Sequence, residues 1–126
     1  MACNCSCGGD CKTTLLYSCS GAANTGYLAD RVWRALITTD AGEGTCLAGV
    51  GADLSGFLRS AEEGDNILLD GCSVGCGKKM FEKKGLPFTQ IVMTDYGVKK
   101  GETEITSDVV DRVAAKILKQ INKAGV

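Results

Sequence analysis

The stretch Asn66-Ile67-Leu68-Leu69-Asp70-Gly71-Cys72-Ser73-Val74-Gly75-Cys76 decides the fold that we expect for this chain. Its first half is an apolar run that ends at a glycine, which is typical of a buried strand. The strand leads directly into Cys72, and residues 75–84 predict a short helix that Gly85 closes. A buried strand followed at once by a helix indicates an α/β fold with a parallel sheet.

The same alternation of strand and helix recurs on both sides of this stretch. Apolar runs predict further strands at residues 13–18, 45–50 and 89–94. Apolar residues that repeat every three or four positions predict further helices at residues 24–38, 54–63 and 106–121. Four such units imply a single Rossmann-like α/β domain in three layers, with about four mostly parallel strands flanked by helices. We assign residues 13–126 to this domain and residues 1–12 to a cysteine-rich N-terminal segment.

Length and charge narrow the class of protein. A chain of 126 residues fits one domain with a real hydrophobic core, so it should fold without disulfide bonds. A net charge of -1 gives no electrostatic drive towards nucleic acid, and no segment approaches the roughly 18 apolar residues of a membrane span. The N-terminus has neither the basic start nor the apolar stretch of an export signal. We therefore expect a cytoplasmic protein that binds neither nucleic acid nor membrane, and the sequence identifies no protein partner.

Eight cysteines and no histidine are the outstanding feature of the composition. In a reducing compartment, thiols in this number are typical of metal ligands or redox groups. A secreted disulfide scaffold is the alternative, but a chain with this α/β pattern does not need cross-links. The cysteines are therefore the candidate functional residues.

Cys72 and Cys76 are the first two candidate metal ligands. They are four positions apart, so their sulfurs would project from one face if the helix began at Cys72. Zinc in a structural site takes four ligands in a tetrahedron, and without histidine the others must be cysteines or carboxylates. Asp70, just before the pair, is expected to accept hydrogen bonds that fix the turn behind the ligands.

Cys19 and Cys46 are the candidates for the remaining two positions. Cys19 follows the first strand, and the carboxyl ends of parallel strands open on one crevice, so Cys19 and Cys72 should face the same space. Cys46 lies in the strand predicted at 45–50, and it would point to the wrong end if it sits at the start of that strand. The alternative for Cys46 is a buried side chain that packs as a small apolar group.

Four further cysteines lie close together near the N-terminus, at Cys3, Cys5, Cys7 and Cys11. Their spacing suits a second metal site for zinc or copper(I). Two alternatives stay open: a terminal segment without a ligand, since chain ends are often disordered, or a segment that donates to the main crevice from outside.

The segment that follows the first strand carries a second signal. Residues 19–26, with sequence Cys-Ser-Gly-Ala-Ala-Asn-Thr-Gly, resemble a phosphate-binding turn in which backbone N–H groups cradle an anion. The segment lacks the Gly-Lys-Ser/Thr ending of a Walker loop and the arginine of a cysteine phosphatase loop. Lysines such as Lys99 and Lys100 can screen a thiolate cluster, but solvated charges are the preferred interpretation.

Three motifs taken together resemble the DGC-domain family of zinc-binding proteins, which is named for an Asp-Gly-Cys motif. They are Cys19-Ser20-Gly21-Ala22, Cys46-Leu47-Ala48-Gly49-Val50-Gly51-Ala52 and Asp70-Gly71-Cys72-x-x-x-Cys76. The resemblance runs from about Thr14 to Lys100. It implies zinc binding through Cys19, Cys46, Cys72 and Cys76, and it assigns no role to the N-terminal cysteines.

The leading hypothesis is a protein that holds, senses or transfers a metal ion, zinc or another soft metal, at a four-cysteine site. A thiol-based redox enzyme or a sulfur or selenium carrier is the alternative, with Cys72 and Cys76 or Cys19 as the reacting groups. A third hypothesis makes zinc the structural support of a protein–protein module. Enzymatic activity is the minority interpretation.

Overall fold

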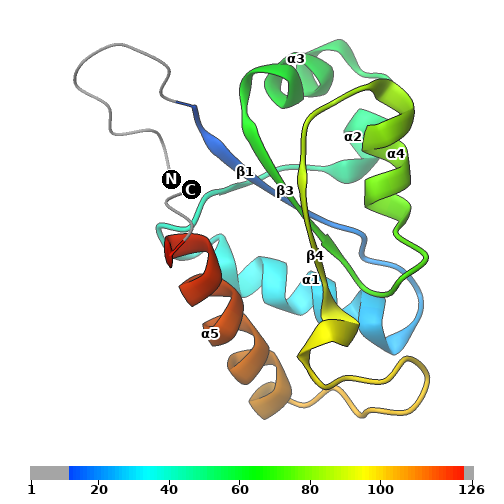
Figure 1. Ribbon diagram of the computed structural model, residues 1–126, viewed down its shortest axis with the longest axis vertical. Helices are drawn as coiled ribbons and strands as arrows, with labels where there is room; N and C mark the ends of the chain where they lie inside the picture. Colours follow the sequence, from blue (N-terminus) through cyan, green and yellow to red (C-terminus); the bar gives the residue numbers. More distant parts are fainter. Residues whose placement is uncertain (1–11, 124–126) are drawn as a thin grey trace.

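Four parallel strands form the centre of the protein in the computed structural model, which describes residues 12–123 (Figure 1). The strands are β1 (Thr14–Ser18), β2 (Glu43–Gly44), β3 (Asp65–Asp70) and β4 (Thr89–Val92). They are arranged in the order β2-β1-β3-β4. The predicted α/β class and the parallel sheet are therefore confirmed.

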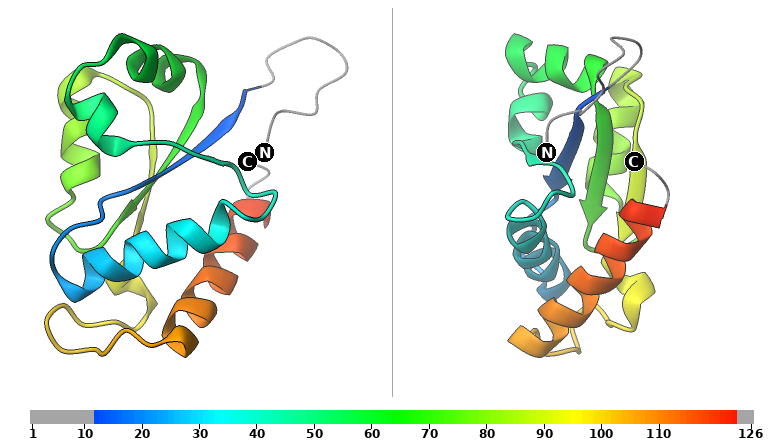
Figure 2. Two further views of the ribbon diagram at one scale, coloured as in Figure 1. Left: turned by 180° about the vertical axis from the view of Figure 1, so that it is seen from behind. Right: turned by 90° about the vertical axis from the view of Figure 1, so that its left-hand side faces the viewer.

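Helices cover both faces of this sheet (Figure 2). They are α1 (Asn24–Leu36), α2 (Leu47–Gly51), α3 (Ser55–Glu63), α4 (Cys76–Lys84) and α5 (Ser107–Lys123), and a short 3₁₀ helix, η1 (Met93–Tyr96), follows β4. Helices α1 and α5 pack on one face with β-strand residues such as Leu16 and Leu69. Helices α2, α3 and α4 pack on the other face with Tyr17 and Leu68. Because successive strand residues point to opposite faces, β1 and β3 need apolar residues at nearly every position.

One polar network lies inside the second cluster. The Tyr17 hydroxyl, on a side chain that is 1% exposed, donates to Asn66 Oδ1 at 3.0 Å. The Asn66 amide in turn donates to the carbonyl oxygens of Ala61 and Pro87. Burial raises the pKa of Tyr17 to about 12. The buried Tyr17 hydroxyl and Asn66 amide thus both have hydrogen-bond partners.

The strand predicted at residues 45–50 is wrong. Strand β2 contains only Glu43 and Gly44, and residues 47–51 form α2. The run contains Leu47 and Val50, which are three positions apart and both pack against the cluster that contains Tyr17. That spacing places two side chains on one face of a helix, whereas a strand would send them to opposite faces. Cys46 therefore lies beyond the carboxyl end of β2, which removes the alternative in which it points to the wrong end of the sheet.

The strand order creates a switch point between β1 and β3. The connection after β1 leads to β2 on one side, and the connection after β2 crosses back to β3 on the other side. In open α/β sheets, ligands bind where the connections diverge in this way, outside the carboxyl ends of the strands. Within residues 12–123, none of the helices has the length and apolar character needed to cross a membrane.

Candidate functional site

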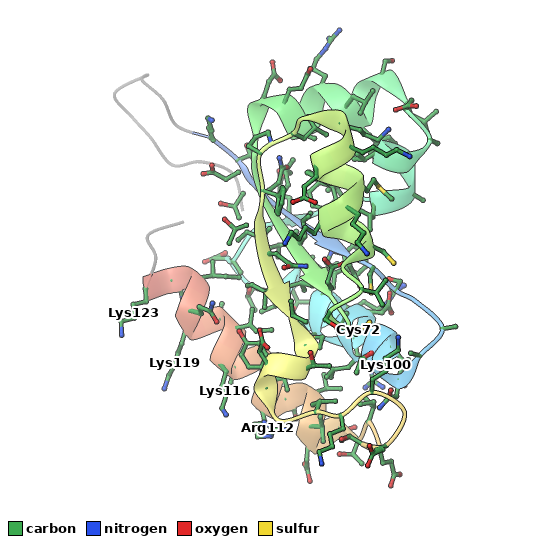
Figure 3. All side chains as sticks on the ribbon, turned by 45° about the vertical axis from the view of Figure 1, so that its right-hand side comes forward. Cys72, Lys100, Arg112, Lys116, Lys119 and Lys123 are labelled. Atoms are coloured by element: carbon green, nitrogen blue, oxygen red, sulfur yellow. The ribbon has the colours of Figure 1, made fainter. Side chains whose placement is uncertain are left out.

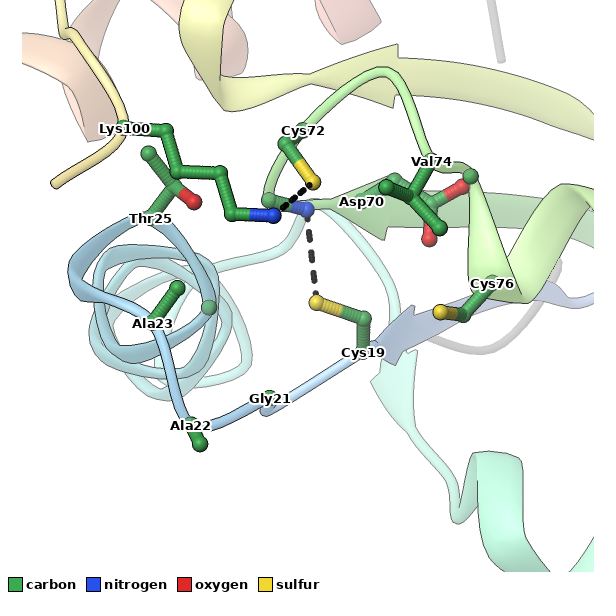
Figure 4. A pocket seen from close by; sticks show the side chains of 13 residues that line it. Cys19, Gly21, Ala22, Ala23, Thr25, Asp70, Cys72, Val74, Cys76 and Lys100 are labelled. Carbon is green, nitrogen blue, oxygen red and sulfur yellow. Dashed lines mark hydrogen bonds between the residues drawn. The ribbon is translucent and has the colours of Figure 1, made fainter.

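A pocket of about 200 Å³ opens at this switch point (Figure 4). We call it the thiol pocket because three of the predicted ligands line it, namely Cys19, Cys72 and Cys76. Cys19 comes from the end of β1, Cys72 from the turn after β3, and Cys76 from the start of α4. The prediction that Cys19 and Cys72 face the same crevice is therefore confirmed.

The turn between β3 and α4 differs from the helical turn that the Cys-x-x-x-Cys spacing suggested. Helix α4 begins at Cys76, and Cys72 lies outside it. Gly75 adopts a left-handed conformation with φ of 64°, and its N–H donates to the Cys72 carbonyl oxygen at 3.1 Å. Because Cys72 lies before the helix and the left-handed Gly75 separates it from Cys76, the two sulfurs do not project from one helical face.

Asp70 fixes the start of α4. Its side chain is 1% exposed, and its carboxylate accepts hydrogen bonds from the backbone N–H groups of Gly77 at 2.9 Å and Lys78 at 3.2 Å. Gln90 Nε2 on β4 donates to the same carboxylate at 2.8 Å. A carboxylate at a helix N-terminus satisfies free N–H groups and meets the positive end of the helix dipole. Asp70 thus holds the turn behind the cysteines, as the sequence predicts.

Glycines bring the backbones of α1 and of the β3–α4 turn into contact. A Cβ atom at Gly71 would lie 2.7 Å from the Gly26 nitrogen, and one at Gly26 would lie 2.5 Å from the Gly21 carbonyl oxygen. Neither position has room for a side chain. The pocket wall between Cys19 and Cys72 is therefore made of backbone.

Cys19 is half-buried beside this wall. Its Sγ accepts a hydrogen bond from the Gly71 N–H at 3.3 Å. Burial raises the pKa of the Cys19 thiol, and backbone hydrogen bonds from Gly21 and Gly71 lower it less than burial raises it. The thiol form of Cys19 is favoured in the absence of a ligand.

Cys72 has a cation beside it. Lys100 Nζ donates to Cys72 Sγ at 3.4 Å. Figure 3 shows Lys100 beside Cys72, whereas the other labelled cations follow α5. Lys100 is exposed, as the sequence favours, and it also reaches Cys72; this contact spans 28 positions, so no local signal in the sequence indicates it.

The loop that carries Lys100 is held by the first residue of α1. Asn24 Nδ2 donates to the carbonyl oxygens of Lys99 at 3.1 Å and Thr103 at 2.8 Å. Asn24 Oδ1 accepts from the Gly101 N–H at 2.7 Å. One side chain therefore fixes three points of the loop around Lys100.

Cys46 lines a neighbouring pocket, of about 510 Å³, which it shares with Cys19 and Cys76. Its side chain is exposed, so the alternative of a buried apolar cysteine is wrong. Cys19 and Cys76 line both pockets, and they connect Cys46 to Cys72.

The four cysteines are free thiols and are not closed into a ligand shell. Among the residues from 12 to 123, no three cysteine or acidic side chains converge closely enough to hold a metal ion. The N-terminal candidates Cys3, Cys5, Cys7 and Cys11 lie outside the described residues. The fold thus gathers thiols from three strand ends in two adjoining pockets.

The parallel sheet and its flanking helices make this an α/β protein, and its cysteines lie where such sheets bind their ligands. A family model described as the DGC domain matches residues 15–117, so the chain belongs to the DGC-domain family. Over 88 residues it is 35% identical to the Anaerobic and virulence modulator AnvM of Pseudomonas aeruginosa, a match that covers 68% of this chain and 67% of AnvM. No solved structure matches the chain.

Proposed function

We propose that this chain binds a soft metal ion, zinc first among them, through the thiolates of Cys19, Cys72 and Cys76, with Cys46 as the fourth ligand. The observation that carries the proposal is that three thiols from separate segments line one pocket at the switch point of the sheet. Thiolate sulfur is a preferred donor for zinc and copper(I), and four cysteines make a complete tetrahedral donor set for zinc.

The bound metal is held reversibly in this proposal, for sensing or transfer. Zinc–sulfur bonds are about 2.3 Å long, so the thiols must approach one another when the metal binds. Cys46 and Cys76 are exposed, and they lie just before α2 and at the start of α4, where side chains can move without disturbing the sheet. Both hydrophobic clusters are built without these two residues. We therefore expect the fold to form without the metal.

Metal content per chain tests this proposal. The full chain is purified without added zinc and compared with Cys72→Ser and with a variant in which Cys3, Cys5, Cys7 and Cys11 are all serine. We expect the Cys72→Ser variant to lose the metal ion that the four-cysteine site holds, and the N-terminal variant to keep it. Equal metal content in wild type and Cys72→Ser, or none in either, would overturn the proposal.

Removal of the metal separates reversible binding from a structural role. We expect the far-UV circular dichroism of the chelator-treated protein to stay that of a folded α/β domain. Unfolding on chelation would instead favour zinc as the support of a protein–protein module.

Thiol chemistry at Cys72 is the second candidate function, and the contact with Lys100 favours it. The Lys100 ammonium lies 3.4 Å from the Cys72 sulfur, so a cation stands beside the group that would react. The Cys72 thiolate would attack a disulfide substrate and release one thiol, and Cys76 would then displace the second thiol and leave a Cys72–Cys76 disulfide. The name of AnvM describes a modulator, and a regulatory role suits either reversible metal binding or this thiol exchange.

A further inference from the structure

A buried hydroxyl in the thiol pocket has no partner. Thr25, in the first turn of α1, is 0% exposed, and among residues 12–123 no group forms a hydrogen bond with its Oγ1. The residue lines the pocket, and Figure 4 shows the hydroxyl turned towards it, on the side of the Lys100 ammonium. Buried polar atoms are nearly always bonded, so an orphan hydroxyl at a pocket wall points to a ligand.

The first turn of α1, which carries this hydroxyl, also has backbone donors without an acceptor. Helix α1 has 13 residues, and its N-cap, Ala23, has no side chain that can accept a hydrogen bond. The N–H groups of Asn24, Thr25 and Gly26 donate to no acceptor in the described part of the chain, and the first intrahelical bond starts at Tyr27. These groups also carry the positive end of the helix dipole.

The charged side chain that is free to bind at the pocket wall is positive, like the start of α1. Lys100 is the cation among the lining residues, and Asn24 holds its loop against the start of α1. Asp70 is the carboxylate among them, but its oxygens already accept from Gly77, Lys78 and Gln90. Apart from its thiols, this wall therefore offers hydrogen-bond donors and a cation, which is the complement of an anion.

We propose that the thiol pocket binds a small oxyanion, or the phosphate group of a small phosphomonoester, beside Cys72. The N–H groups at the start of α1, the Thr25 hydroxyl and the Lys100 ammonium hold it. The pocket shares its thiols with the proposed metal site, but the inference does not rest on metal binding, because none of these three donors is a metal ligand. Residues 19–26 then act as the anion-binding turn that their sequence resembles.

Amide chemical shifts of the full chain, reduced and treated with chelator, test the proposal. The protein is titrated at low millimolar concentration with sodium phosphate, sodium sulfate, methyl phosphate or, as a control at matched ionic strength, sodium chloride. We expect saturable shifts at residues 23–26 and 71–72 with at least one of the three oxyanions. A preference for methyl phosphate identifies a phosphomonoester ligand, and a preference for phosphate or sulfate identifies a free oxyanion.

Two variants assign the binding groups. Lys100→Met should weaken binding about tenfold, whereas Lys99→Met, a change at the neighbouring exposed lysine, should leave it unchanged. Thr25→Val keeps the volume and removes the orphan hydroxyl, so without anion its melting temperature should equal or exceed that of wild type. The anion-induced rise in melting temperature should then be smaller in Thr25→Val than in wild type.

Non-specific stabilisation by phosphate and sulfate acts on all variants alike, so the comparison between variants removes it. The proposal is wrong if no oxyanion gives saturable shifts, or if Lys100→Met and Thr25→Val bind as wild type does. Because the protein is metal-free throughout, either result leaves the metal proposal to be judged on its own measurement.

Discussion

The centre of the sheet and the thiol pocket at the carboxyl ends of its strands differ in how their polar groups are hydrogen-bonded. In the centre, the buried Tyr17 hydroxyl has its partner in Asn66. In the pocket, the equally buried Thr25 hydroxyl has none among residues 12–123. The polar groups of the centre have their hydrogen-bond partners and support the fold, whereas the pocket keeps donors without acceptors and free thiols. We therefore place the proposed functions at the carboxyl ends of β1 and β3.

Replacement of Asp70 by alanine should have the largest effect on stability, because Asp70 joins the two regions. The change removes a buried carboxylate and leaves the N–H groups at the start of α4 and the Gln90 amide without their acceptor. We expect a loss of about 3 kcal/mol in the free energy of unfolding, measured by urea denaturation.

Asp65→Ala is the matched control, because Asp65 is the exposed first residue of the same strand. It should change the free energy of unfolding by less than about 0.5 kcal/mol. Similar values for the two alanine variants would mean that Asp70 does not fix the turn.

The sequence predicts the centre of the sheet and the helices that pack on it well. Strand β3 is apolar at positions that face both clusters, and α4 ends at Gly85 in the left-handed conformation expected of a C-terminal glycine. Such signals are local, because they depend on residues that follow one another in the chain. The crevice between Cys19 and Cys72 then follows from the general rule that the carboxyl ends of parallel strands open on one side of the sheet.

The pocket is predicted less well, because its contacts join distant residues. Cys72 meets Lys100 across 28 positions, and Asn24 holds the Lys100 loop across more than seventy positions. The helix at 47–51 was missed because a short apolar run with glycines fits both a strand and a helix. The left-handed Gly75 was missed because four-residue spacing suggests a helical turn wherever it occurs.

A rise in pH should destabilise the centre of the sheet most, through Tyr17, and the thiol pocket less, through Cys19. Burial raises the pKa of Tyr17 from 10.0 to about 12, so the unfolded chain loses this proton at lower pH than the folded one. Stability is therefore fully present below pH 10 and falls as the pH rises towards 12, by about 2 kcal/mol from this group.

Urea denaturation between pH 8 and 12 measures the effect. Tyr17→Phe should flatten most of the decline, and Tyr27→Phe, a change at an exposed tyrosine, should not. Tyr96, whose pKa burial also raises, contributes a smaller decline in the same direction. An equal slope in wild type and Tyr17→Phe would show that Tyr17 does not titrate in this way.

The smallest effects on stability are expected from the exposed thiols. In reduced, chelator-treated protein, Cys46→Ser and Cys76→Ser should each change the free energy of unfolding by less than about 0.5 kcal/mol, because both side chains are exposed. Cys19→Ser should cost more, about 1 kcal/mol, because Cys19 is half-buried and packs against the cluster around α1 and α5.

Urea denaturation of the three variants side by side tests this order, with zinc added in a second series. Zinc should stabilise wild type and stabilise each variant less, because a ligand that binds the folded state raises its stability by an amount that grows with the ratio of ligand concentration to Kd. A loss of several kcal/mol from Cys46→Ser without metal would make the thiols part of the support of the fold. The pocket would then support the fold as the centre does, and this result would contradict the proposal that the metal is held reversibly.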